Sequence, residues 1–448
     1  MSTNSYTLHT DLYQLTMSAI YHARNMGGMA TFSLFTHNLP DTRNFIVTAG
    51  LEQALDYLEN FTLTKEDLDY LASLNMFEES FLTRLAYLNF SGEVRAVPEG
   101  TICAAGEPLV EITAPLIEAQ MVETLLMNTI NINSTLASKA ARSRLAAKGK
   151  GLLEFGLRRT QGLDAGMSAA RSAAMVGFIG TSNVAAAKKF DIIPVGTMAH
   201  SYITAFNSEM DAFRAFAATF PQNTILLVDT YDVITGVKRA IEIGMELRKQ
   251  GHELAGVRID SGDLGALSFE ARKLLDAAGL TSTKVVVSGN LEEMSITKLM
   301  EQKVPIDTFA VGTRMSSSAD APVLDLAYKL VNYNQRPTLK LSTGKETLPN
   351  PKQIWRQYDA DGKIAHDLIG MRDESQPGKP LLVKVMENGR RTKARGTWRD
   401  AKQVFESDLA TLPEACLSLT EKHRLQVELS PALSSLQSKV RAEALAAA

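Results

Sequence analysis

A histidine in the stretch "VGTMAHSYITAF", residues 195–206, is the first candidate for chemistry in this chain. His200 is one of only seven histidines, and it follows a short apolar run. Hydroxyl side chains stand on both sides of it, at Thr197 and Ser201. An imidazole in such surroundings can be a hydrogen-bonded core residue, a general base, a metal ligand or a nucleophile. The local sequence leaves these roles open.

Groups of polar residues follow six short apolar runs, of which His200 marks only one. The runs are "GLLEFGL", "FDIIPVG", "NTILLVDT", "LAGVRID", "TKVVVSG" and "DTFAVGT". The polar groups are, in the same order, Arg158 and Arg159; Thr197, His200 and Ser201; Asp229 and Asp232; Arg258, Asp260, Ser261 and Asp263; Ser288, Gly289 and Asn290; Gly312, Thr313 and Arg314. Arginine forks and glycine–hydroxyl turns at helix starts are typical of anion sites. The set therefore predicts a site for a sugar phosphate.

Aspartates and one aromatic residue extend this interpretation. Asp260 and Asp263 suit ribose hydroxyls or a magnesium ion bound largely through substrate phosphates. Phe155 could stack on a flat ring. Each residue alone also has a structural explanation, since Phe155 could be core and Asp229 or Asp232 could cap a helix. The joint pattern favours function, and the sequence contains no Walker loop, G-x-S-x-G motif or His/Cys ligand cluster.

The six apolar runs also predict the elements that hold these residues. Consecutive Val, Ile, Leu and Phe are typical of strands buried on both faces of a parallel sheet. Helix-like stretches lie between the runs; "YDVITGVKRAIEIGMELRKQG" ends at Gly251, a good stop signal. Repeated strand–helix units predict a right-handed parallel α/β architecture. Polar residues at successive strand ends favour a barrel over an open sheet.

Composition narrows the class of protein. The 45% apolar and 22% charged content is that of an ordinary globular protein, and the net charge of -3 gives no field for nucleic acid or an anionic membrane. Cys103 and Cys416 are too far apart in sequence to suggest a zinc site or a disulfide framework. The N-terminus lacks the features of a secretory signal, and no apolar run approaches the roughly 20 residues that span a bilayer. We expect a cytoplasmic enzyme with no nucleic-acid or membrane partner.

The motifs in their order resemble the nicotinate phosphoribosyltransferase family. The resemblance runs from "TDLYQLTM" through "VPEGTICAAGEPLVEI", "FGLRRTQG", "GTSNVAAA", "GTMAHSYITAF", "VRIDSGDL", "VSGNL" and "FAVGTRM" to "LKLSTGKETLPNPKQIWR". It implies an α/β fold: an irregular parallel β/α barrel over residues 136–335, with a second α+β lobe built from residues 1–135 and 336–448. It also implies a homodimer with an active site shared between subunits.

The resemblance further implies an activity in NAD salvage. The substrates would be nicotinate and phosphoribosyl pyrophosphate, with Mg²⁺, and the products nicotinate mononucleotide and pyrophosphate. ATP hydrolysis would be coupled to transfer through a phosphohistidine, as in a ligase-type enzyme of the EC 6.3.4 class. The "AHS" motif places that phosphohistidine at His200. This gives the opening histidine the role of a transient phosphate carrier.

The resemblance assigns the remaining site residues by motif. Arg258 and Asp260 would join His200 as catalytic residues. The nicotinate site would contain Tyr13, reaching from the partner subunit, with Phe155, Arg158, Ser182, Thr197 and Arg258. The phosphoribosyl pyrophosphate site would contain Asp260, Ser261, Asp263, Gly289, Asn290, Gly312 and Thr313. The protein alone would fix no metal, and Asp260 or Asp263 would hold Mg²⁺ together with substrate phosphates.

Four alternatives differ in class or substrate. Related nicotinamide enzymes carry an aspartate in a "GTD" motif, whereas this chain has Ser182 in "GTS", which favours nicotinate because serine can donate to a carboxylate. A quinolinate enzyme would need a denser basic pocket and no phosphohistidine. A nucleotide-sensing, non-catalytic barrel would bind its ligand without turnover. An aldolase-type barrel would need a Schiff-base lysine, which the apolar runs lack.

Overall fold

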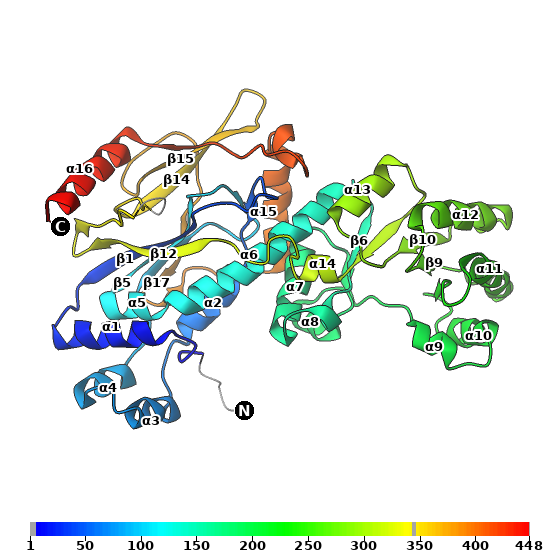
Figure 1. Ribbon diagram of the computed structural model, residues 1–448, viewed down its shortest axis with the longest axis horizontal. Coiled ribbons are helices and arrows are strands. Elements are labelled where there is room, and N and C mark those ends of the chain that lie inside the picture. The colour runs from blue at the N-terminus through cyan, green and yellow to red at the C-terminus, as the bar shows by residue number, and fades with distance from the viewer. Residues whose placement is uncertain (1–5, 343–345, 448) are drawn as a thin grey trace. The chain divides into compact units, whose positions relative to one another are not determined.

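The computed structural model describes residues 6–342 and 346–447. The motif "LKLSTGKETLPNPKQIWR" therefore lies partly outside the described residues. The chain divides into two compact units (Figure 1). We call residues 139–322 the barrel unit, and residues 1–138 with 323–448 the terminal unit. The predicted fold class, a parallel β/α barrel of irregular form with a second α+β lobe, is confirmed.

The barrel unit is built on a six-stranded parallel sheet. Its strands lie in the order β7-β6-β11-β10-β9-β8. Their bounds are β6 (Gly151–Glu154), β7 (Gly180–Thr181), β8 (Ile225–Leu227), β9 (Gly256–Ile259), β10 (Lys284–Val287) and β11 (Thr308–Val311). Because β7 and β8 end the sheet without pairing to each other, it forms a half-barrel and not a closed ring. All six carboxyl ends meet at one edge, where ligands bind in such sheets.

One predicted strand is wrong. The run "FDIIPVG" contributes only a single bridge, between Pro194 and Thr181. That bridge is made by the residues on either side of the proline, since Thr181 N donates to the Ile193 carbonyl at 3.0 Å and Val195 N donates to the Thr181 carbonyl at 2.9 Å. Proline has no N–H with which to pair on its other side, so the segment can lie only at a sheet edge. The strand at this position is instead the two-residue β7, which precedes Ser182 in the "GTS" motif.

Helices follow the strands as expected, and polar caps start several of them. They are α7 (Leu163–Met175), α8 (Val184–Phe190), α9 (His200–Thr204), α10 (Glu209–Thr219), α11 (Val233–Lys249), α12 (Leu264–Ala277), α13 (Glu293–Glu301) and α14 (Thr313–Ser316), with a 3-10 turn η1 (Leu157–Arg159). Asp232 caps α11 by accepting from Thr235 N at 2.8 Å, and Asp263 caps α12 by accepting from Ala266 N at 3.1 Å. Helix α6 (Glu123–Ala146) begins in the terminal unit and ends in the barrel unit.

The terminal unit combines three sheets with helices from both ends of the chain. Its sheets are β13-β12-β1-β5-β3-β17-β18, β16-β14-β15-β19 and β2-β4. The strands are β1 (Met29–Thr36), β2 (Ile46–Val47), β3 (Glu93–Ala96), β4 (Ile102–Cys103), β5 (Pro108–Pro115), β12 (Leu326–Tyr333), β13 (Arg336–Pro337), β14 (Lys352–Tyr358), β15 (Ile364–Met371), β16 (Lys379–Pro380), β17 (Val383–Glu387), β18 (Arg390–Arg391) and β19 (Val427–Leu429). The helices are α1 (Leu12–Ala23), α2 (Leu51–Glu59), α3 (Lys65–Ser73), α4 (Glu79–Ala86), α5 (Leu116–Met121), α15 (Trp398–Thr411), η2 (Glu414–Leu417) and α16 (Pro431–Ala447). No helix among the described residues is both long and apolar enough to cross a bilayer.

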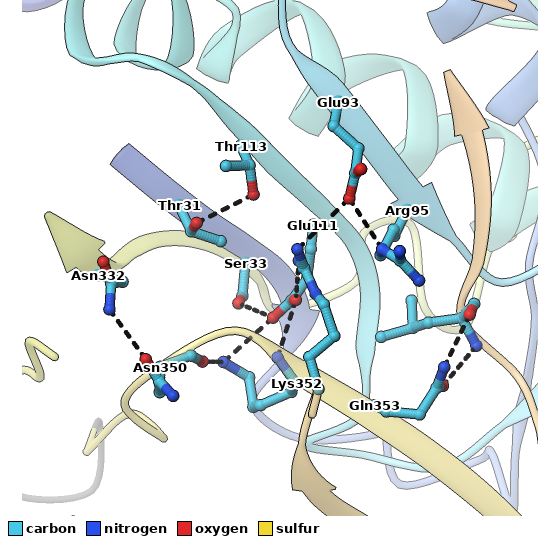
Figure 2. A network of polar contacts seen from close by, with 12 residues as sticks. Thr31, Ser33, Glu93, Arg95, Glu111, Thr113, Asn332, Asn350, Lys352 and Gln353 are labelled. Atoms are coloured by element: carbon cyan, nitrogen blue, oxygen red, sulfur yellow. Dashed lines mark hydrogen bonds and ion pairs between the residues drawn. The ribbon is translucent and has the colours of Figure 1, made fainter. Parts of the chain in front are cut away.

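A buried polar network fixes β14 onto the large sheet of the terminal unit. Figure 2 shows Glu111 of β5 at its centre, with Ser33 and Lys352 pointing toward it. Glu111 accepts from Ser33 Oγ at 2.6 Å and from the Lys352 backbone N at 2.9 Å, and Arg372 Nη2 donates to it at 2.8 Å. Burial opposes ionisation, but Lys352 and Arg372 outweigh it and hold the pKa of Glu111 below its usual range. The network therefore keeps a fully buried carboxylate charged and paired.

A second buried cluster in the terminal unit surrounds Arg356. It contains a carboxyl group, Glu107, whose pKa is shifted in the opposite direction to that of Glu111. Burial first, and then the nearby charge of Asp367, raise the pKa of Glu107 well above its usual value. Glu107 Oε2 accepts from Ala104 N at 2.9 Å, while Oε1 has no partner unless it carries a proton and donates to Asp367. We therefore expect Glu107 to be neutral in the folded protein.

This raised pKa predicts a loss of stability as pH rises. Above the ordinary pKa of about 4.5, the unfolded chain releases a proton that folded Glu107 retains, so each increase in pH up to the folded pKa favours unfolding. Glu107→Gln keeps the shape of the side chain and, through its amide N–H, a hydrogen-bond donor, but it has no proton that titrates in this pH range. We expect its thermal midpoint relative to the parent to rise steadily with pH from about 5 upward. The exposed Glu443→Gln is the control, and a Glu107→Gln difference that does not change with pH would contradict the prediction.

Candidate active site

A cavity of about 670 Å³ lies at the carboxyl ends of the barrel-unit strands. It is lined by Phe155, Leu157, Arg158, Arg159, Ser182, Gly196, Thr197, Met198, Ala199, His200, Leu227, Arg258, Asp260, Ser288, Gly289, Asn290, Ala310, Gly312 and Thr313. All predicted site residues except Tyr13, Ser261 and Asp263 are in this set. Residues that follow β6, β7, β9, β10 and β11, together with the segment 196–200 that leads into α9, bring together side chains that are up to 158 positions apart in the chain (from 155 to 313).

The three remaining residues lie elsewhere. Tyr13 is on α1 of the terminal unit with 45% of its surface exposed, and its proposed reach into a partner subunit stays a prediction. Ser261 is one residue beyond the cavity lining and donates to Asp229 Oδ2 at 2.6 Å. Asp263 caps α12 and lines a neighbouring cavity of about 580 Å³, which shares Gly289 and Asn290 with the first.

Arg258 of β9 is the best-anchored cation in the cavity. Its Nε donates to Ser288 Oγ at 2.8 Å, Nη2 donates to Asp260 Oδ1 at 2.7 Å, and Nη1 donates to Thr197 Oγ1 at 3.2 Å. The guanidinium also lies over the Phe155 ring, 5.3 Å from its centroid. Such a stacked, hydrogen-bonded arginine presents fixed positive charge beside an aromatic face. A flat, anionic ring fits these two features together.

Glycine is required where the loop after β10 meets the loop after β9. Gly289 has a φ of +94°, and a Cβ there would lie 1.9 Å from the Asp260 carbonyl oxygen. Asn290 follows with a φ of 48°, so two successive residues are left-handed. This close approach leaves backbone N–H groups at the cavity wall, where they can bind a phosphate. After the neighbouring strands β6 and β11, Arg159 Nη1 donates to Thr313 Oγ1 at 3.4 Å.

His200, the first residue of α9, faces the side chain of Asp229, one of the polar residues predicted to gather at the strand ends. Its Nδ1 lies 3.1 Å from Thr230 Oγ1, and its Nε2 lies 4.0 Å from Asp229 Oδ1. The Asp229 side chain is fully buried, and Oδ2 accepts from Asp260 N at 3.1 Å. Oδ1 is buried and has no hydrogen-bond partner among the described residues. The buried Asp229 carboxyl group therefore faces the imidazole ring of His200 directly.

Asp229 and Ser288 are two site residues that the structure identifies more sharply than the sequence does. Their residue types alone do not distinguish them from neighbouring polar residues. Both directly follow apolar runs, which was the available signal. Asp229 and Asp232 have equivalent positions in the pattern, but Asp232 caps α11 while Asp229 points toward His200. Ser288 donates to Asp260 Oδ1 and accepts from Arg258, so it holds both in place.

These features are typical of one class of protein, the parallel α/β enzymes that bind an anionic substrate at their strand ends. Comparisons with known proteins specify it further. Residues 8–131 match the nicotinate phosphoribosyltransferase N-terminal domain, and residues 151–358 match the nicotinate phosphoribosyltransferase family. The chain belongs to the nicotinate phosphoribosyltransferase family.

Individual relatives agree with this assignment. The chain is 43% identical over 415 residues to nicotinate phosphoribosyltransferase pncB2 of Mycobacterium tuberculosis, covering 92% of this chain and 89% of the relative. It is 39% identical over 380 residues to the nicotinate phosphoribosyltransferase of Bacillus subtilis, covering 83% and 77%. The crystal structure of human nicotinic acid phosphoribosyltransferase is similar, with a TM-score of 0.88, 28% identity and coverage of 96% of this chain and 99% of that chain.

Proposed function

We propose that this protein transfers the phosphoribosyl group of phosphoribosyl pyrophosphate to nicotinate in NAD salvage, and that ATP hydrolysis is coupled to the transfer through a phosphohistidine at His200. The products are nicotinate mononucleotide and pyrophosphate. One observation carries the proposal: a single cavity joins the Arg258–Phe155 pair, the glycine loops and a histidine facing a buried carboxylate. Family membership supplies the choice of base.

The cavity provides for both halves of the nicotinate molecule. Phe155 offers a flat face to the pyridine ring, and Arg258, whose guanidinium lies over the Phe155 ring, adds a fixed positive charge to the same cavity. Arg158 and Ser182 line the same cavity and can donate to the carboxylate. These contacts hold the ring nitrogen toward the ribose, so that it attacks the anomeric carbon as the bond to pyrophosphate breaks. Such a reaction depends on positioning more than on acid–base groups.

Magnesium fits the acidic side of the cavity. Asp260 lines it with a carboxylate that is 30% exposed, and oxygen ligands of this kind suit Mg²⁺ when substrate phosphates supply the rest. When bound, the ion would neutralise charge on the leaving pyrophosphate. Asp260 is held for this role by Arg258 and Ser288, and the backbone around Gly289 and Asn290 would receive the 5-phosphate.

The histidine step balances without an added acid or base. An unprotonated ring nitrogen of His200 attacks the terminal phosphorus of ATP, a P–N bond forms, and the P–O bond to ADP breaks. Positive charge develops on the ring, and Asp229, 4.0 Å from Nε2, offsets it. Water later cleaves the P–N bond and restores the histidine. A doubly charged group would attract donors around the cavity, which is how ATP cleavage could favour substrate binding.

A product assay tests the proposal against its alternatives. Purified protein with phosphoribosyl pyrophosphate and Mg²⁺ receives nicotinate, nicotinamide or quinolinate, each with and without ATP, and mononucleotides are separated by chromatography. Nicotinate mononucleotide, strongly enhanced by ATP, is the expected result. Turnover of nicotinamide or quinolinate instead would show that the proposed substrate is wrong. Tight ligand binding with no turnover would favour a nucleotide sensor.

We expect Ser182 to determine the preference for nicotinate, which carries a carboxylate, over nicotinamide, which carries an amide. Ser182→Asp places a carboxylate in the cavity, where it repels nicotinate and can accept from nicotinamide. We expect the kcat/KM ratio of nicotinate to nicotinamide to fall by roughly tenfold or more. Ser282→Asp, at an exposed serine before β10, is the matched control. An unchanged ratio in Ser182→Asp would remove Ser182 from base recognition.

We further infer that the active enzyme is a homodimer whose site includes Tyr13 of the second chain. This rests on the resemblance of "TDLYQLTM" and on the exposure of the Tyr13 ring. Mixing Tyr13→Ala with His200→Ala protein would restore activity above that of either alone if sites are shared. A fully active monomer in analytical ultracentrifugation would contradict the proposal.

A further inference from the structure

Glu154 is a buried carboxylate directly behind the cavity, and no step of the proposed reaction uses it. It is the last residue of β6, precedes Phe155, and is 1% exposed. Strand β6 lies between β7 and β11 in the sheet, so the Glu154 side chain can reach the loops of both neighbours. A carboxylate at the end of the run "GLLEFGL" is unusual, because acidic residues are rarely this buried without a specific role.

The two oxygens of Glu154 accept from donors in three separate segments of the chain. Oε1 accepts from Gly156 N at 2.5 Å and from Ser316 Oγ at 3.2 Å, and Oε2 accepts from Thr181 Oγ1 at 2.5 Å. Gly156 follows β6, Ser316 ends the short helix α14 after β11, and Thr181 is the last residue of β7. All three are themselves buried, so water cannot easily replace the carboxylate as their acceptor.

Two of the partners are adjacent to residues of the cavity wall, and the third belongs to the same short helix as one. Gly156 follows Phe155, which offers the ring face; Thr181 precedes Ser182 of the base site. Ser316 closes α14, which begins at Thr313 in the phosphate loop. The Ser182 backbone N also donates to the Glu154 carbonyl at 2.8 Å. Glu154 is therefore bonded to the chain segments that carry the proposed ring contact (Phe155), carboxylate contact (Ser182) and phosphate contact (Thr313).

The packing around Glu154 leaves little freedom to compensate for its loss. A Cβ on Gly156 would lie 1.6 Å from Ser316 Oγ and 2.8 Å from Glu154 Oε1, so the loops after β6 and β11 meet with no spare space. Burial raises the pKa of Glu154, and Thr181, Gly156 and Ser316 oppose that rise because an ionised carboxylate accepts from all of them.

We propose that Glu154 is a positioning residue that fixes the spacing of Phe155, Ser182 and the Gly312–Thr313 loop, and thereby sets affinity for nicotinate and phosphoribosyl pyrophosphate and the preference for nicotinate. The role in substrate affinity rests on the proposed function. The role in loop order does not, because it follows from the hydrogen bonds alone. Displacement of binding groups by about 1 Å can reduce rates by roughly a hundredfold.

Glu154→Gln tests this with an isosteric side chain. An amide nitrogen would face either the Gly156 N–H or the Thr181 hydroxyl, so at least one bond is lost. We expect KM for both substrates to rise by roughly ten- to a hundredfold, with a smaller fall in kcat and a lower nicotinate-to-nicotinamide ratio. Thr181→Val, which removes one donor, should change the same quantities in the same direction. Glu154→Asp, which keeps the charge, should retain more of the affinity than Glu154→Gln.

Asp307→Asn is the matched control, because Asp307 accepts from Val285 N at 2.9 Å at the opposite edge of the same sheet. It should change neither the KM values nor the base ratio. If Glu154→Gln lowers the thermal midpoint yet leaves KM and base ratio at parent values, the positioning role is overturned.

Hydrogen–deuterium exchange separates this inference from the proposed function. In Glu154→Gln, exchange should increase in residues 155–160, 181–183 and 312–316 and stay at the parent level around Val285. This holds whether or not the protein turns over nicotinate. Uniform or unchanged exchange would contradict the inference itself, whereas an inactive parent protein with the expected exchange pattern would contradict only the proposed function.

Discussion

Replacing His200 with alanine should abolish the stimulation of nicotinate mononucleotide formation by ATP. The imidazole is the proposed acceptor of the terminal phosphate, and no other histidine lines the cavity in the part of the chain that the structure describes. Loss of an enzymatic nucleophile typically reduces its reaction by roughly three orders of magnitude or more. We therefore expect ATP hydrolysis to fall to near background, measured as ADP release in the presence of both other substrates.

Labelling with ATP radioactive in its terminal phosphate gives the direct measurement. The parent protein should acquire an acid-labile, alkali-stable label, as phosphohistidine does, and His200→Ala should acquire none. His252→Ala is the matched control, since His252 lies before β9, at the edge of the sheet away from the cavity. Label that persists in His200→Ala would keep the family assignment and remove the phosphate carrier from His200.

The strands were predictable wherever a run of apolar residues was long enough to be buried on both faces. Five of the six runs contain a strand, namely β6 and β8 to β11, because Val, Ile and Leu on consecutive positions suit a covered parallel sheet. The remaining run, "FDIIPVG", forms only a single bridge at Pro194, which has no N–H with which to pair on its other side. The true strand, Gly180–Thr181, is two residues long and carries no periodicity. Whether the sheet closes into a full barrel could not be predicted from the sequence either, because a half-barrel and a full barrel are built from the same strand–helix unit.

The site was predictable because parallel strands deliver their carboxyl ends to one edge. That rule predicted that Arg258 and Asp260 lie together, and both line one cavity; His200 lines it too, although the run before His200 forms no strand. The rule could not tell which polar residue near each strand end faces the cavity. Asp263 and Asp260 look alike in "VRIDSGD", yet one caps α12 and the other binds Arg258. The role of Glu154 could not be predicted for a different reason. It lies inside an apolar run, and its hydrogen-bond partners become known only from the structure.

Arg356→Met should lower the free energy of unfolding of the terminal unit by about 3–5 kcal/mol. Arg356 is fully buried. It donates through Nε and Nη2 to both oxygens of Asp367, at 2.9 and 2.7 Å, and through Nη1 to Asp408 at 2.8 Å. Methionine fills a similar volume, so the loss comes from leaving two buried carboxylates without their cation.

The thermal midpoint, followed by circular dichroism, measures this effect. Lys65→Met is the contrasting control: its pair with Asp69 is exposed on both sides, at 86% and 63%, and such pairs contribute roughly 0–1 kcal/mol. Adding Asp408→Asn to Arg356→Met should recover part of the loss, because one orphaned charge is removed. If Arg356→Met melts within a degree of the parent, the cluster holds its charges less tightly than its geometry indicates. A partial recovery would instead show that the energy lies in the unpaired carboxylates and not in the packing of the arginine side chain.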